Sequence, residues 1–115
     1  MIPDCLFCKI AAHEIPSQIV YEDDLVIAIN DINPAAPAHV LIMPKEHWAS
    51  LDQVDEKQQL WLGHIQVIAA LIAKNLGLAE NGYRLVCNCG ADGGQTVMHI
   101  HYHLLGGRGL GWPPG

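Results

Sequence analysis

A chain of 115 residues, half of them hydrophobic, is long enough to form one domain with its own core and too apolar to be disordered. Six basic residues against twelve acidic ones give a net charge of -6, which argues against nonspecific binding to nucleic acids or anionic membranes. The first residues lack the features of a signal peptide, and no segment reaches transmembrane length. We therefore expect a single domain over residues 1–115, cytoplasmic, with reduced cysteines.

The first half of the chain predicts a short helix followed by three strands. Residues 5–12 favour a short N-terminal helix that ends before a proline. Residues 18–22 and 25–30 flank a pair of aspartates, a pattern typical of a β-hairpin. Two prolines make residues 31–38 a loop, and residues 39–43 read as a third strand.

A long helix is predicted next. Asp55 and Gln58 form a capping box at its start, and Gly77 is placed to end it just after Leu76. One apolar stripe consists of Trp61, Ile65, Ile68, Ala69, Ile72 and Leu76. A second consists of Leu60, Val67 and Leu71. A helix that is apolar on most sides is usually buried on most sides, so we expect a second subunit to cover it in a homodimer.

The last part of the chain predicts two further strands. Residues 83–88 favour the fourth strand, residues 90–95 a glycine-rich loop, and residues from 96 or 97 to 105 the fifth strand. The glycine- and proline-rich tail over residues 106–115 cannot continue a sheet. Together the elements predict an α+β domain with a five-stranded antiparallel sheet, one long helix and a short N-terminal helix.

Three histidines at alternate positions are the strongest chemical signal. In a strand, His99, His101 and His103 would point to one face. Neighbouring imidazoles cannot all be protonated at neutral pH, so at least one is free to attack phosphorus. The middle residue, His101, is the natural nucleophile, through a phosphorus–nitrogen bond that water later cleaves. The same spacing also occurs in metal sites or on a merely polar face, and spacing alone leaves these alternatives open.

The loop before the histidines adds phosphate-binding potential. Its glycines allow backbone amides to approach phosphate oxygens. The Gln95 amide and the Thr96 hydroxyl offer further donors, and Thr96 could relay a proton to a departing amine.

Five segments together resemble a known family. Residues 99–105 match the His-x-His-x-His-x-x signature of the histidine-triad (HIT) superfamily. Residues 31–34, 37–40 and 93–96 and the ending Trp-Pro-Pro-Gly over 112–115 resemble its Hint branch, the histidine-triad nucleotide-binding proteins. The resemblance covers nearly the whole chain and implies a homodimer whose two sheets join. It also implies hydrolysis of purine nucleoside phosphoramidates such as adenosine 5'-phosphoramidate, with binding of AMP or GMP and no cofactor required for catalysis.

The resemblance also implies roles for individual residues. His101 matches the nucleophile that becomes nucleotidylated and His103 the residue that contacts the phosphate. His99 and His39 match the residues that complete a four-histidine cluster. Nucleotide-binding positions around the ribose, base and phosphate fall on Asp31, Ile32, Phe7, Ile10, Asn88, Gly94, Gln95 and Thr96. Threonine at position 96 departs from the serine common in this branch, which puts the rate of proton delivery in doubt.

Cys5 and Cys8 form a Cys-x-x-Cys pair, which by itself is a weak metal signal. Some bacterial relatives of similar sequence complete a structural zinc site with two histidines, which match His47 and His99 here. In that case His99 serves the metal and not the substrate. The alternative is a pair of reduced, partly buried cysteines.

Three other functions remain open beside the phosphoramidate hydrolase. The first is a nucleotide-binding regulatory protein with weak catalysis, which the threonine at position 96 keeps in consideration. The second is a zinc module whose histidine triad is structural. The third is a dinucleoside polyphosphate hydrolase, against which the short chain and the Trp-Pro-Pro-Gly ending speak.

Overall fold

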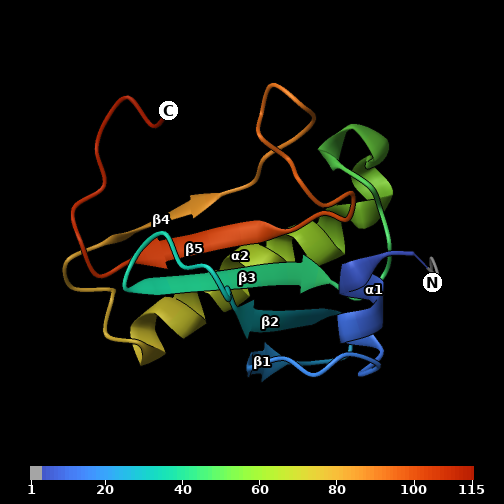
Figure 1. The fold of residues 1–115 in the computed structure, drawn as a ribbon, viewed down its shortest axis with the longest axis horizontal. Coiled ribbons are helices and arrows are strands. Elements are labelled where there is room, and N and C mark those ends of the chain that lie inside the picture. The colour runs from blue at the N-terminus through green and yellow to red at the C-terminus, as the bar shows by residue number, and fades with distance from the viewer. Residues whose placement is uncertain (1–3) are drawn as a thin grey trace.

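The computed structural model describes residues 4–115, and their centre is a five-stranded antiparallel sheet in the order β1-β2-β3-β5-β4. The long helix α2 lies across one face, and the short helix α1 lies against the other face at one end (Figure 1). The helices and strands are α1 (Leu6–Ala11), β1 (Ile19–Glu22), β2 (Val26–Asn30), β3 (Ala38–Pro44), α2 (Gln59–Asn75), β4 (Tyr83–Val86) and β5 (Tyr102–Gly106). This architecture confirms the predicted α+β fold with its five strands and two helices.

The central strands are buried on both faces because their side chains alternate between two cores. On β2, Val26 and Ala28 belong to the cluster under α2, whereas Ile27 and Ile29 belong to the cluster under α1. The same alternation along β3 places Val40 and Ile42 under α2 and Leu41 and Met43 under α1. The register pairs Ile27 with Met43 and Ile29 with Leu41, so each face receives matched apolar pairs. The α1 face of these strands also forms the floor of the site described below.

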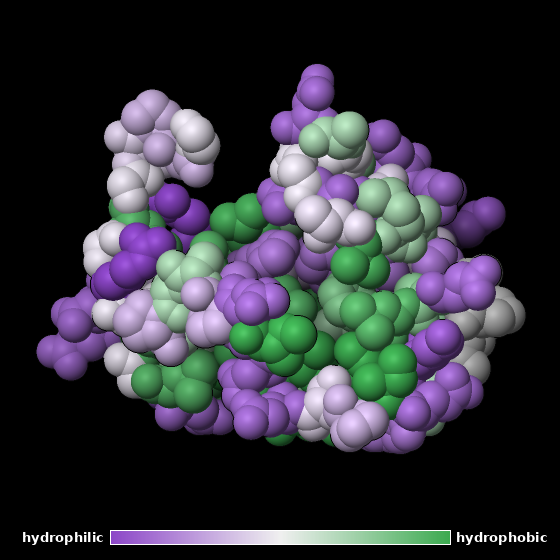
Figure 2. Space-filling view, in the orientation of Figure 1, coloured by the Kyte–Doolittle hydropathy of each residue, from purple (hydrophilic) through white to green (hydrophobic). Residues whose placement is uncertain are grey.

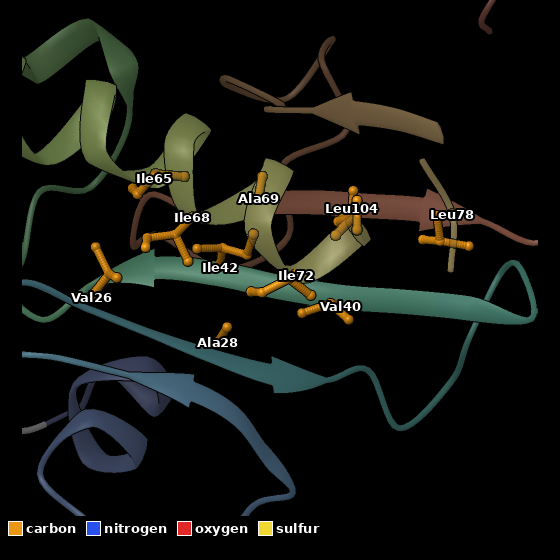
Figure 3. Packing of buried hydrophobic residues seen from close by; sticks show 11 residues of the cluster. Val26, Ala28, Val40, Ile42, Ile65, Ile68, Ala69, Ile72, Leu78 and Leu104 are labelled. Atoms are coloured by element: carbon orange, nitrogen blue, oxygen red, sulfur yellow. The ribbon is translucent and has the colours of Figure 1, made fainter. Parts of the chain in front are cut away.

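The helix α2 packs through one stripe at helical spacing. Ile65, Ile68, Ala69 and Ile72 point from the helix toward Val26, Val40, Ile42 and Leu104 of the sheet (Figure 3). This confirms four members of the predicted stripe. Leu76, which was expected in the same stripe, is 47% exposed because the helix has ended at Asn75.

The predicted start and end of the long helix are confirmed. Asp55 and Gln58 form the capping box, although the first turn, Glu56–Gln58, is a 3-10 turn that precedes α2. Gly77 has φ +76°, the left-handed conformation that ends a helix at little cost only in glycine. Within residues 4–115 no helix is both long enough and apolar enough to cross a membrane.

The last two strands are shorter than predicted. β5 begins at Tyr102 and not at residue 96 or 97, and β4 ends at Val86 and not at residue 88. The partner strands limit both. The last ladder pair of β3 with β5 joins Ile42 to Tyr102, and β3 ends at Pro44, which has no N–H to donate. β4 pairs only with β5, so its ladder ends where Val86 meets His103, next to the start of β5. Residues 96–101 therefore reach β5 in an irregular path, with Ile100 N–H bonded to the Trp48 carbonyl at 2.8 Å.

Candidate active site

A pocket of about 910 Å³ opens on the α1 face of the sheet. Its walls are mostly apolar side chains of α1, β2 and β3 and of the segments beside them. Figure 2 shows apolar residues gathered over α1, β2 and β3 on this face, with polar residues around them. Its polar lining consists of Ser17, Gln18, Asn30, Asp31, Thr96, His101 and His103, of which His101 and His103 have adjacent rings. An apolar slot with a polar end suits a ligand that carries a flat ring at one end and a charged group at the other.

His101 is held with one ring nitrogen ready to attack. Its Nδ1 lies 2.8 Å from the His99 carbonyl oxygen, and since a carbonyl can only accept, Nδ1 carries the proton. The lone pair is therefore on Nε2. The ring is 5% exposed, and Phe7 meets it edge-on at a centroid distance of 4.9 Å. Packing and one hydrogen bond thus fix the orientation of the ring and, for its neutral form, the tautomer whose Nε2 carries the lone pair.

His103 lies next to His101, with ring centroids 5.0 Å apart. Burial, together with the neighbouring His101 and His39 rings, lowers the pKa of His103 to about 4. Its Nδ1 lies 2.9 Å from Nε2 of His39. His103 is therefore neutral at pH 7 and can serve a phosphate only as a hydrogen-bond donor.

His99 faces a different environment from the other two triad members. It is fully buried, and its Nε2–H donates to the Pro44 carbonyl oxygen at 2.8 Å. Its Nδ1 lies 3.2 Å from Cys5 Sγ and 3.6 Å from Cys8 Sγ. The expectation that all three histidines line one surface on a strand is therefore wrong: only His103 is on β5, and His99 lies outside the pocket lining.

Four potential metal ligands converge around His99. The donor atoms of Cys5, Cys8, His47 and His99 all lie within 4.8 Å of one another. His47 Nδ1 is 3.4 Å from Cys8 Sγ and 3.1 Å from His99 Nδ1. Tetrahedral zinc with bonds of about 2.0 to 2.3 Å would hold its ligand atoms roughly 3.3 to 3.8 Å apart. Two thiols and two imidazoles at nearly these separations fit a zinc ion without rearrangement of the backbone.

The residues expected to hold the nucleoside line the pocket. Phe7 and Ile10 come from α1 and are buried, at 4% and 6% exposure. Asp31 and Ile32 follow β2, and Ile32 is 92% exposed at the pocket edge. One Asp31 oxygen, Oδ1, accepts a bond from Asn33 N–H at 2.7 Å, which orients the carboxylate. An apolar wall beside an oriented carboxylate provides contacts for a base and for ribose hydroxyls.

The glycine-rich loop provides fewer phosphate donors than the sequence predicted. The N–H groups of Gly94 and Gln95 bond within the loop, to Ala91 and Gly90 carbonyl oxygens at 3.0 Å each. The Gln95 amide donates to the Ala49 and Val97 carbonyls and accepts from Gly90 N–H. The expectation that Gln95 donates to phosphate is therefore wrong.

Three residues of the expected site remain to be placed. Thr96 is exposed, and within residues 90–96 it is the one residue that lines the pocket, so its hydroxyl is the candidate donor from this segment. Asn88 is half-buried beside Gly94 and outside the pocket lining. His39 is likewise outside the lining, but it contacts the site through His103 and through Asp31, whose Oδ2 is 3.4 Å from His39 Nε2.

Two polar clusters were missed at the sequence level. Asp23 ties the β1–β2 turn to α2 through a 2.6 Å contact with His64 and also accepts from the Tyr21 hydroxyl. Arg108 reaches from the tail to the loop before β3 and bonds the Ala35 carbonyl. Neither cluster has a sequence signature, because each joins residues more than 40 positions apart.

Acidification should destabilise the metal-free protein. Burial is the main cause that lowers the pKa of both His99 and His103 to about 4, against about 6.5 in an unfolded chain. The unfolded state therefore takes up protons first as the pH falls, and the free energy of unfolding decreases between about pH 6.5 and pH 4. From pH 7 to pH 5 we expect a loss of about 2 kcal/mol for each histidine.

Urea unfolding of chelator-treated protein at the two pH values measures this loss. A His103→Asn variant should lose only part of the dependence, since His99 remains. A free energy of unfolding that stays constant or rises on acidification to pH 5 would contradict the buried neutral state of both rings.

The comparisons with known proteins agree on one family. The sequence model of the HIT domain family matches residues 12–110. A protein of Synechococcus elongatus described as an uncharacterized HIT-like protein is 51% identical over 115 residues, which is 100% of both chains. A purine nucleoside phosphoramidase of Escherichia coli K12 is 50% identical over 111 residues, covering 96% of this chain and 93% of the relative.

The fold comparison gives the same result. The crystal structure of a HIT family hydrolase from Legionella pneumophila superposes with a TM-score of 0.96 at 51% sequence identity. The match covers 97% of this chain and 100% of that chain. The likeness therefore extends over the sheet, both helices and the histidine segment together.

Proposed function

The chain belongs to the HIT domain family, and from this membership we propose that it hydrolyses purine nucleoside phosphoramidates, cleaving their phosphorus–nitrogen bond through a nucleotidyl-histidine intermediate. The observation that supports this most strongly is the His101 ring. Its proton is on Nδ1, bonded to the His99 carbonyl, and its free Nε2 belongs to a residue that lines the pocket. The Escherichia coli relative, by its description, acts on this class of substrate.

The reaction has two steps in which His101 takes and then returns the nucleotidyl group. In the first, the Nε2 lone pair attacks the α-phosphorus, and the bond from phosphorus to the amine nitrogen breaks. As it leaves, the amine takes up a proton from solvent through the Thr96 hydroxyl, and the His99 carbonyl stabilises the positive charge on the His101 ring through Nδ1–H. In the second, water attacks the same phosphorus, loses a proton, and the phosphorus–Nε2 bond breaks to release a nucleoside monophosphate. The proton that water loses in this step balances the uptake in the first.

Recognition of the nucleotide is assigned to the rest of the pocket. The apolar wall with Phe7 and Ile10 would hold the purine, and Asp31 would accept bonds from the ribose hydroxyls. His103, kept neutral by burial, would donate to a phosphate oxygen. In the second step, water would accept the nucleotidyl group from His101. The product in the pocket would then be AMP or GMP.

The proposed reaction is tested by a comparison of two substrates. We expect kcat/KM for adenosine 5'-phosphoramidate to exceed that for a diadenosine polyphosphate by at least about tenfold, about 1.4 kcal/mol of transition-state free energy. The reverse preference would assign the chain to dinucleoside polyphosphate hydrolysis. Tight purine nucleotide binding with negligible turnover of both substrates would instead favour a regulatory protein.

Thr96 provides a prediction about proton delivery. A Thr96→Val variant keeps the size of the side chain and loses the hydroxyl, so kcat for an alkylamine phosphoramidate should fall about 10- to 100-fold. A Thr96→Ser variant should stay within about threefold of the parent, since its hydroxyl remains. With an aromatic amine, which leaves with less need of a proton, the loss in Thr96→Val should shrink. An unchanged kcat for the alkylamine substrate in Thr96→Val would remove Thr96 from the reaction.

We propose that Cys5, Cys8, His47 and His99 hold a structural zinc ion. The near-tetrahedral separations of their donor atoms support this assignment. With four protein ligands the ion would have no open position, so its contribution would be structural. His99 would then serve the metal through Nδ1 while its carbonyl oxygen orients His101. In this way the N-terminal helix α1 would be tied to the active-site segment.

We also propose a homodimer, on the basis of a face that residues 4–115 leave uncovered. Leu60 and Val67 are 64% and 66% exposed, and Leu71 is also exposed on the same stripe of α2. The edge strand β4 lies at the end of the sheet order, open to pairing. A second copy that covers both features would satisfy the apolar stripe and the strand edge together.

A charge placed in the stripe tests the homodimer. A Val67→Lys variant should weaken dimerisation at least about tenfold by sedimentation analysis. A Gln66→Lys variant adds the same charge one position away, off the stripe, and should leave the association unchanged. Equal effects of both variants, or a monomeric parent chain, would contradict the assigned face.

A further inference from the structure

One backbone amide determines the tautomer of His39. The Ala35 N–H donates to His39 Nδ1 at 3.0 Å. Since a backbone N–H can only donate, this nitrogen carries no proton, and His39 is a neutral ring with its single proton on Nε2. His39 is buried, so water does not compete for the ring.

The tautomer of His39 in turn determines that of His103. The His39 Nε2–H points to His103 Nδ1 at 2.9 Å, with Asp31 Oδ2 farther away at 3.4 Å. His103 Nδ1 is therefore an acceptor, and the proton of the His103 ring is on Nε2. Within residues 4–115 the only hydrogen-bond partner of the His103 ring is His39, so the Nε2–H of this pocket-lining side chain is left for a ligand.

Ala35 lies in a loop without regular structure that is held by contacts with the tail after β5. Residues 31–37 form no helix or strand, and Ala35 is exposed. The Arg108 guanidinium bonds the Ala35 carbonyl oxygen through both Nε, at 3.3 Å, and Nη2, at 2.9 Å. The turn that carries Arg108 is close to the same loop: Gly107 has φ +90°, and a Cβ there would lie 2.9 Å from Pro37 Cβ. The tail after β5 therefore holds the loop at two neighbouring points.

We propose that Arg108 is a positioning residue: by holding the Ala35 carbonyl it fixes the backbone at Ala35, so that the N–H of the adjacent peptide group is aimed at His39 Nδ1 and the proton of His103 is set on the nitrogen left for the phosphate. The chain of contacts runs from the Arg108 guanidinium to Ala35, from Ala35 to His39, and from His39 to His103. Each link has a donor and an acceptor that cannot exchange roles while the first N–H stays in place. The consequence for turnover rests on the proposed function, whereas the consequence for the tautomers does not.

Nitrogen-15 NMR of histidine-labelled protein tests this assignment at neutral pH. In the parent chain, His39 and His103 should both give the Nε2–H tautomer. In Arg108→Ala both rings should become mixtures of tautomers, and kcat should fall about fivefold with KM changed much less, as the loss of about one hydrogen bond predicts. Arg108→Lys keeps one donor and should restore part of both effects.

Two further variants sharpen the outcome. Arg84→Ala is the control. Arg84 lies on β4 and holds the tail at a different point, through a 2.7 Å bond to the Gly111 carbonyl, so its removal should leave both tautomers unchanged. Ala35→Pro deletes the N–H itself and should release His39 even with Arg108 in place. Unchanged His39 and His103 tautomers in Arg108→Ala would overturn the proposal, as would equal effects of the two arginines. Absence of phosphoramidate turnover in the parent chain would overturn the proposed function alone, because the tautomers are read directly.

Discussion

Replacement of His101 by alanine should lower kcat/KM for adenosine 5'-phosphoramidate by at least about 10⁴-fold, the effect typical of the loss of a catalytic nucleophile. Neither of the other two triad histidines can take over its role. His99 Nδ1 faces the two thiols and His47, and His103 presents a nitrogen that carries a proton and has no free lone pair. Steady-state kinetics with a fluorogenic phosphoramidate measures this loss, because the fluorescence assay is sensitive enough to follow a rate about 10⁴-fold lower.

The structure offers a matched control for this variant. His13 is exposed and paired with Glu22, so His13→Ala removes an equal side chain away from the pocket and should keep the full rate. His101→Ala should still bind a nucleoside monophosphate within about tenfold of the parent, because the base and ribose contacts remain. A His101→Ala protein with more than about one-tenth of the parent turnover would rule out covalent catalysis by this residue.

If zinc is bound as proposed, its removal should lower the melting temperature by roughly 15 °C, because an ion present at about 1,000 times its dissociation constant stabilises the folded state by about 4 kcal/mol. The four proposed ligands come from the N-cap and first turn of α1, from the segment after β3 and from the segment before β5. Without the metal, α1 would no longer be tied to the segment that carries His101, and Phe7 and Ile10 of α1 would no longer be held in the pocket wall. The KM for the nucleotide should therefore rise along with the loss of stability.

Calorimetry before and after chelation, with metal analysis of the protein as purified, makes this test. Cys5→Ser should lose bound zinc and most of the stabilisation by metal. Cys87→Ser is the matched control, since Cys87 is outside the cluster, and it should keep both. One zinc per chain that Cys5→Ser also retains would contradict the ligand assignment. A melting temperature that chelation leaves unchanged would contradict the structural role.

The regular elements were predictable because they follow from local patterns. The Asp55–Gln58 capping box and Gly77 determine where the long helix begins and ends, and both signals involve residues close in sequence. The nearly continuous apolar runs of β2 and β3 likewise indicate burial on both faces. The segment before β5 was mispredicted as a strand because its alternation of histidines and apolar residues mimics one. Its actual path depends on where β3 and β4 end, which is a property of the assembled sheet.

The candidate site was predictable as a set of residues but not as a set of roles. The histidine spacing identified His101 and His103, which do line the pocket. It could not reveal that the Gln95 side-chain amide is fully engaged in hydrogen bonds with three backbone groups and so is not available to a phosphate. Nor could it reveal Arg108 and Ala35, whose contact joins positions 73 residues apart. Hydrogen bonds between loops depend on tertiary packing and leave no periodic trace in the sequence.

The most direct test of the account is to look for the nucleotide on the enzyme. Parent protein mixed with adenosine 5'-phosphoramidate, denatured at alkaline pH within the first turnover and digested, should give one adenylylated peptide, with the modification on His101. His101→Ala treated in the same way should give none. Rapid product formation with no adduct in the parent protein, or an adduct on a different residue, would contradict the role of the His101 ring as nucleophile.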